Sequence, residues 1–140
     1  MPYRFLPDVA LADIAYEADA PSADALFESC ARALSDIMVD RRTLRHKVVR
    51  EFSMTSDDID RLLYDFLTEL IVVKDVDSLL FGDFKVRVAP SGESLTAVAR
   101  GETIDRQRHA LRNDVKAVTM HMFGVNRVGK RWRATVVLDI

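Results

Sequence analysis

The sequence contains almost no cysteine: Cys30 is the only one among 140 residues. A single cysteine excludes an intramolecular disulfide framework and any zinc site built from several cysteines. Cys30 lies within an apolar pattern, which is typical of a small buried residue in a reducing compartment. The sequence also lacks an apolar run long enough to cross a membrane. Its opening stretch, MPYRFLPDVA, contains two prolines and an acid, unlike a signal peptide. These absences predict a soluble, cytoplasmic protein.

An excess of positive charge is missing as well. The chain has 20 lysines and arginines against 22 acids, which gives a net charge of −2. Because no overall basic field attracts nucleic acid or anionic lipid, we expect no membrane partner and weak or absent direct RNA binding. Hydrophobic residues make up 49% of the chain, enough for a real core. With no repeat, low-complexity segment or linker, residues 1–140 are predicted to form one domain.

Two segments have the apolar periodicity of amphipathic helices. The first covers residues 22–39, with Ser22 as its N-cap. The second is predicted to begin at a cap on Ser56 and to continue to about Val73. Its stripe repeats at three- and four-residue intervals and consists of Ile59, Leu62, Leu63, Phe66, Leu67, Leu70 and Ile71. Both helices are expected to pack one face against the core.

The remaining patterned segments alternate with a period of two, which is typical of strands. These six predicted strands cover 12–18, 46–54, 81–88, 94–102, 115–123 and 132–140. Turn residues separate the third from the fourth and the fifth from the sixth, and residues 103–114 form a polar loop. The pattern predicts an α+β fold: a mixed or antiparallel sheet of about six strands with both helices on one face.

The common motifs for nucleotide, phosphate and zinc binding are absent, and no serine or cysteine is placed with a histidine as a nucleophile–base pair. Acids lie near the ends of the first and last predicted strands: Asp8, Asp13 and Asp139, followed by Ile140. Carboxylate and main-chain oxygens are the ligands that hard cations prefer. The alternative is a set of solvated acids, and local spacing alone does not bring Asp13 to Asp139.

A second candidate lies in the strand predicted at 115–123. Strict alternation there places Thr119 and His121 on one face and Lys116 on the other. A threonine–histidine pair could transfer protons, but a cross-strand hydrogen bond or a half-exposed imidazole is the better interpretation.

Two clusters of basic residues form a third candidate, because such clusters can contact phosphates. One contains Arg100, Arg106, Arg108, His109 and Arg112, and the other Arg41, Arg42, Arg45, His46 and Lys47. Neither has interleaved aromatic residues, which favours solvated loops or contact with an acidic protein.

Several stretches resemble the archease family over almost the whole chain. The similar segments are ADIAYEA (12–18), ALFESCARALSDIMVD (25–40), DRLLYDFLTELIVVKD (60–75), GE at Gly101–Glu102, DVKAVTMHMF (114–123) and VVLDI (136–140). The resemblance implies an α+β fold whose strand-helix-strand-strand core carries an inserted segment. It also implies a calcium site with Asp13, Asp139 and Ile140 as ligands, the last through main-chain oxygen. Asp8, Lys116 and His121 are possible additional members of the site.

The resemblance further implies a protein cofactor rather than an enzyme. Its partner would be an RtcB-type RNA ligase in tRNA splicing, and it would promote ligase guanylylation and multiple turnover. A chaperone-like effect on a tRNA methyltransferase is an alternative. A metal-dependent enzyme is disfavoured, because no nucleophile or organised substrate pocket is evident in the sequence.

The chain departs from the family at the first motif. Where the family has D-H-T-A-D, this sequence has DVALAD, in which only Ala12 and Asp13 match. Ala10 and Leu11 replace the histidine and threonine, and Asp8 lies one residue upstream of the expected acid. Fewer polar ligands predict weaker calcium affinity.

Overall fold

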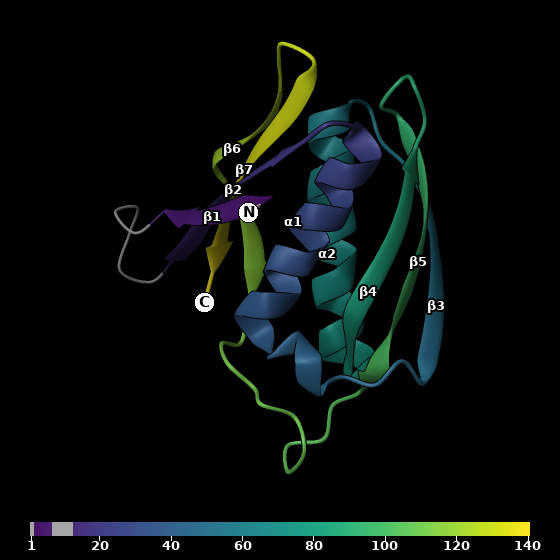
Figure 1. Ribbon diagram of the computed structural model, residues 1–140, viewed down its shortest axis with the longest axis vertical. Helices are drawn as coiled ribbons and strands as arrows, with labels where there is room; N and C mark the ends of the chain where they lie inside the picture. Colours follow the sequence, from purple (N-terminus) through teal and green to yellow (C-terminus); the bar gives the residue numbers. More distant parts are fainter. Residues whose placement is uncertain (1, 7–12) are drawn as a thin grey trace.

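The computed structural model describes residues 2–6 and 13–140. These residues form two α-helices, one short 3-10 helix and seven strands (Figure 1). In chain order the elements are β1 (Tyr3–Leu6), β2 (Asp13–Ala20), α1 (Ala23–Met38), η1 (Arg41–Thr43), β3 (Val48–Thr55), α2 (Ile59–Asp77), β4 (Leu79–Val88), β5 (Ser94–Thr103), β6 (Ala117–Val128) and β7 (Arg131–Asp139). The short edge strand β1 was not predicted from the sequence.

The strands form two antiparallel sheets. The first has the order β1-β2-β7-β6 and the second the order β3-β5-β4. Figure 1 shows α1 and α2 between the two sheets, so the molecule has three layers. The α+β class and antiparallel pairing are confirmed. The strands divide between two sheets rather than one because each helix has enough apolar surface to be covered on both sides.

Helix α1 begins where its capping residue predicts. The Ser22 hydroxyl accepts a hydrogen bond from the Ala25 amide at 3.1 Å. Further along α1, two carboxylates cover the open edge of β4: Asp24 accepts from the Val88 amide at 2.8 Å and Glu28 from the Val86 amide at 2.9 Å. These bonds satisfy edge amides that would otherwise be available for pairing with another strand.

Helix α2 has a different cap from the predicted one. Asp58, not Ser56, accepts the capping bond, from the Arg61 amide at 2.9 Å. The Ser56 hydroxyl instead donates to Asp65 at 2.7 Å. Both serine and aspartate favour the cap position, so composition could not choose between them. The helix also continues past Val73 to Asp77.

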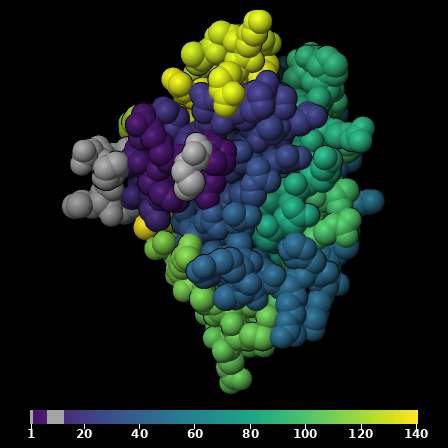
Figure 2. Space-filling model, in the orientation of Figure 1, coloured from purple at the N-terminus to yellow at the C-terminus, as the bar shows by residue number. Residues whose placement is uncertain are grey.

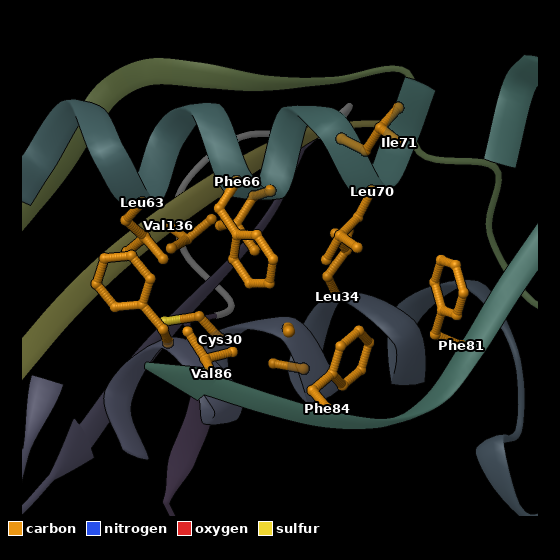
Figure 3. Packing of buried hydrophobic residues seen from close by; sticks show 14 of the residues in the cluster. Cys30, Leu34, Leu63, Phe66, Leu70, Ile71, Phe81, Phe84, Val86 and Val136 are labelled. Carbon is orange, nitrogen blue, oxygen red and sulfur yellow. The ribbon is translucent and has the colours of Figure 1, made fainter. Parts of the chain in front are cut away.

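The core lies between the helices and the two sheets (Figure 3). Leu63 and Phe66 of α2 point towards Cys30 and Leu34 of α1, and Val136 of β7 closes the cluster from the first sheet. All five side chains are fully buried. Each such side chain contributes about 1.5–3 kcal/mol through burial. This core fixes β7, and therefore Asp139 at its end.

Gly101 on β5 allows a close approach between strands. A Cβ atom at this position would lie 1.9 Å from the Leu80 carbonyl oxygen of β4. The β4–β5 register shifts just beyond this contact, between Phe81 and Asp83. Any larger residue at 101 would therefore displace β4 and disturb the neighbouring Glu102.

In the part of the chain that the structure describes, no helix is long and apolar enough to span a membrane.

Candidate functional site

The structure places Asp13 directly opposite Asp139. Strands β2 and β7 are antiparallel neighbours, and Asp13 and Asp139 are partners in their register. Residues opposite one another in such a pair have side chains on the same face, a few ångströms apart. This acid pair lies on the outer face, away from the helices, because the alternate residues Tyr16 and Leu138 are in the core. Among the described residues, neither carboxylate takes part in an ion pair.

The chain before β6 reaches the acid pair from the other side. The Lys116 amide donates to the Asp139 carbonyl at 2.8 Å, and Ala117 is the register partner of Asp139. Lys116 is exposed, whereas Ile140 is half-buried and packs against the core. Asp8 and the rest of the DVALAD stretch before Asp13 lie outside the described residues. The site therefore contains Asp13 and Asp139 at one end of the first sheet, and Lys116 contacts it through its main-chain amide.

Thr119 shares the outer face with the acid pair. It stands opposite Val137, two residues from Asp139 along β7 and on the same face. Its hydroxyl oxygen is buried and has no hydrogen-bond partner among the described residues. A buried polar atom without a partner is uncommon in folded proteins and costs stability. Thr119 therefore adds a hydroxyl with unused hydrogen-bonding capacity to the face that carries the acid pair.

The predicted alternation beyond Thr119 is wrong. Pairing with β7 resumes only at Gly124, so residues 120–123 stand opposite Val136 alone. Met122 has a φ of 57° within this bulge, and His121 is exposed. The Phe123 ring packs edge-on against Tyr64 of α2, with centroids 5.6 Å apart. The bulge ends the simple two-residue alternation, which was the basis for pairing Thr119 with His121.

The loop that leads to the site is anchored by a buried acid, Glu102. One of its carboxylate oxygens accepts from Arg108, and the other accepts from the Arg45 amide at 3.0 Å and contacts His109 Nε2 at 2.8 Å. The hydrogen bond from Arg108, then those from Arg45 and His109, hold the pKa of Glu102 far below its usual range.

The imidazole of His109 is a structural group. Its Nδ1 accepts from the Asp105 amide at 2.9 Å, so Nε2 carries the proton and donates to Glu102. The imidazole is completely buried. The prediction of a solvated cluster is wrong for Arg108 and His109, because a buried acid supplies their partner.

A second anchor holds the end of the same loop. The Lys74 ammonium of α2 is buried and donates to Asp114 at 2.6 Å and to the Val115 carbonyl at 2.7 Å. These bonds fix the chain just before Lys116 turns into β6. The sequence pattern did not single out Lys74, since a lysine near the end of a helix is usually solvated.

The second basic cluster also contains paired charges. Arg41 donates to Asp36 at 2.6 Å, and Arg42 makes an ion pair with Asp40 at 2.8 Å. The Arg42 guanidinium lowers the pKa of Asp40 to about 2. These residues line a groove of about 690 Å³ that also includes Phe5. Arg42 is exposed, as the prediction of a solvated loop expects, whereas Arg41 is half-buried.

The donor atoms at the acid pair fit a hard cation better than zinc. Within residues 2–6 and 13–140 there is no cluster of three acids, histidines or cysteines arranged for a metal. Asp13, Asp139 and main-chain oxygen supply oxygen donors only, and calcium and magnesium bind with water completing their shells.

Comparison with known proteins identifies the family. A model described as "Archease protein family (MTH1598/TM1083)" matches residues 3–140. The archease of Pyrococcus abyssi is 37% identical over 132 residues, which cover 92% of this chain and 93% of the relative. The archease of Methanosarcina barkeri is 32% identical over 141 residues, which cover 99% and 95%.

Two solved structures share the fold. The solution structure of protein 1598 from Methanobacterium thermoautotrophicum has a TM-score of 0.85 and 33% identity, with 99% of both chains covered. A crystal structure from Thermotoga maritima, described as an archease and possible chaperone, has a TM-score of 0.65 and 19% identity over 96% of both chains. Since the family model spans nearly the whole chain and relatives above 30% identity match over most of their length, this chain belongs to the archease family.

Proposed function

We propose that this archease is a protein cofactor that activates an RtcB-type RNA ligase in tRNA splicing. It promotes guanylylation of the ligase and allows multiple turnover. The observation that carries the proposal is the acid pair: Asp13 and Asp139 face each other on the outer side of the first sheet with no ion-pair partner among the described residues. Two like charges held side by side are unfavourable for the fold alone, which supports a role outside it.

A divalent cation, calcium in particular, is the natural ligand of this pair. The carboxylates of Asp13 and Asp139 and the main-chain oxygen of Ile140 would hold it, and the ion would supply positive charge between the two acids. The substitutions at Ala10 and Leu11 remove polar groups from the neighbouring motif, so the affinity is expected to be modest. Lys116 contributes its main-chain amide, which donates to the Asp139 carbonyl at 2.8 Å.

The scaffold around the pair favours a protein-directed role. Asp13 and Asp139 stand near the ends of paired strands whose alternate residues are in the core, so the backbone that carries the carboxylates is held in place. Such an arrangement presents acids to another molecule's surface. The described residues of the site include no serine or cysteine nucleophile, which further supports a partner as the catalyst.

A multiple-turnover ligation assay with the cognate ligase tests the proposal. Wild-type protein is expected to raise turnover, and Asp13→Asn and Asp139→Asn are expected to lose most of that increase. Asp83→Asn provides the matched control, because Asp83 is an exposed strand acid that does not face another acid in the register. Circular dichroism and thermal melting establish that each variant is folded.

Two results would refute the proposal. Full activation by a folded Asp139→Asn variant would exclude the acid pair from function. Absence of activation by the wild type, with the ligase active on its own, would exclude the ligase as partner. A pull-down from the native host that recovers a tRNA methyltransferase instead of the ligase would then favour the chaperone-like alternative.

A further inference from the structure

The hairpin that joins β6 to β7 contains a dense group of cations. Residues 126–133 read NRVGKRWR and include four of the chain's 20 lysines and arginines and no acid. Figure 1 shows this hairpin extending past the ends of the helices, and Figure 2 shows its tip as a protrusion in yellow. The cations are Arg127, Lys130, Arg131 and Arg133, and we call them the hairpin cluster. A net charge of −2 averaged over the chain conceals this local charge.

The hairpin cluster is only partly neutralised by the neighbouring strand. Arg131 and Arg133 both bind Asp19, the latter at 3.3 Å. The Arg133 Nε lies 3.9 Å from Glu17, too far for a hydrogen bond, and has no partner among the described residues. Glu17 also pairs with Arg4 of β1 at 3.3 Å. Two acids therefore pair with three cations, Arg4, Arg131 and Arg133, and a positive excess remains.

Two members of the hairpin cluster have no ion pair in the described part of the chain. Lys130 is exposed at the turn itself. The guanidinium of Arg127 lies over the Trp132 ring, 4.9 Å from its centroid. A guanidinium stacked in this way keeps its planar edge and its N–H groups available.

The spacing of the cations matches a nucleic-acid strand. Arg131 and Arg133 are two residues apart on one face of β7, which separates them by about 6.6 Å along the strand. Successive phosphates of an extended nucleic-acid strand are spaced comparably. The stacked Arg127 and Trp132 lie on the opposite face of the hairpin, because Trp132 alternates with Arg131 and Arg133 along β7 and packs against the core.

We propose that the hairpin cluster binds the phosphate backbone of single-stranded RNA without recognising its sequence. The choice of RNA rather than DNA rests on the proposed role in RNA ligation. The phosphate contact itself does not depend on that role. The hairpin cluster and the acid pair lie on the same sheet, with Arg133 and Asp139 separated by about 20 Å along β7. RNA held at the hairpin would then lie beside the surface that faces the ligase. The sequence-based expectation of weak or absent RNA binding depended on net charge and on two other basic clusters that lack interleaved aromatic residues.

Fluorescence anisotropy with a short, unstructured, fluorescein-labelled RNA and no ligase tests the inference. The double variant Lys130→Gln/Arg131→Gln removes two phosphate contacts. The slope of log affinity against log salt should become shallower by about 1.4, and affinity should fall about 25-fold near 0.1 M salt. Lys85→Gln/Arg87→Gln is the matched control, because these exposed cations are two residues apart on β4 of the other sheet. This control variant should bind the RNA as tightly as the wild type does.

A third variant should have the opposite effect. Asp19→Asn removes the acid that competes for Arg131 and Arg133, so RNA affinity should rise by about fivefold. Absence of salt-dependent binding by the wild type, or an equal loss in the β4 control, would overturn the inference. Displacement of the RNA by a polyglutamate peptide at the same charge concentration would also overturn it, in favour of an acidic protein partner. Because the ligase is absent, these outcomes are independent of ligase activation.

Discussion

Glu102 and the Asp13–Asp139 pair show two opposite ways of placing acids in one small protein. Glu102 is buried, and its two carboxylate oxygens accept from Arg108, Arg45 and His109. The acid pair lies on the outer face of a sheet, and its two residues are partners in the strand register. The first arrangement stabilises the fold by satisfying every charge it buries. The second places two like charges opposite each other, and we propose that a bound cation neutralises them.

The largest expected effect comes from the core that supports both regions. Leu63→Ala removes a fully buried side chain from α2 where it contacts α1 and should lower the free energy of unfolding by about 2–5 kcal/mol. Urea unfolding monitored by circular dichroism measures this loss. The measured loss of unfolding free energy in Leu63→Ala shows how large the effect of a purely structural defect is in this protein. A loss of the same size in Asp139→Asn would mean that the acid pair is structural too.

A smaller effect is expected at Glu102 and depends on pH. Its pKa is depressed in the folded state by Arg108, the Arg45 amide and His109. The stability it contributes is therefore complete above its unfolded pKa of about 4.3 and is lost as the pH falls through the folded pKa. Glu102→Gln should lower the melting temperature at neutral pH and should flatten its decline below about pH 4.3.

The measurement for Glu102 is a series of thermal melts from neutral to acidic pH. The melting temperatures of wild type and Glu102→Gln should converge as the pH falls, because protonation of Glu102 removes from the wild type the negative charge that the variant already lacks. Parallel curves over the whole range would contradict the assignment of Glu102 as the charge that anchors the loop.

The smallest effect is expected at the acid pair without metal. Asp139→Asn relieves repulsion between directly opposed like charges and should raise the free energy of unfolding by about 0.2–1 kcal/mol in the presence of a chelator. Asp83→Asn, which does not face an acid in the register, should show no such gain. Denaturant unfolding at low ionic strength measures the change in the free energy of unfolding for both variants. A clear destabilisation by Asp139→Asn would show that Asp139 supports the fold.

The elements that the sequence predicted well depend on local signals. The stripe from Leu63 to Leu70 and the Ser22 cap specify their helices within a few residues of chain, and the turn residue Gly129 has the positive φ that a hairpin turn uses. The cap of α2 was misplaced because Ser56 and Asp58 are both suitable caps. The choice between them depends on Asp65, which Ser56 contacts.

The features that sequence patterns missed depend on contacts between distant segments. Asp13 and Asp139 lie at opposite ends of the chain, and only their strand register brings them together. The β6 bulge depends on the packing of Phe123 on Tyr64 of α2, which alternation along one strand cannot detect. Arg108 and His109 were expected to be solvated because their partner, Glu102, resembles any other strand acid in the sequence. The resemblance to archeases pointed to Asp13 and Asp139, and their role as ligands stays a prediction.

The most direct test of the central claim is the melting temperature of wild type and Asp139→Asn, each with a chelator and with calcium. A ligand that binds only the folded state stabilises it in proportion to the logarithm of its concentration above Kd. We predict that without calcium the variant is at least as stable as the wild type. With calcium the wild type should gain stability and overtake the variant, whose melting temperature should stay unchanged. An equal rise in both proteins, or no rise in the wild type at any calcium concentration, would contradict the account of the acid pair.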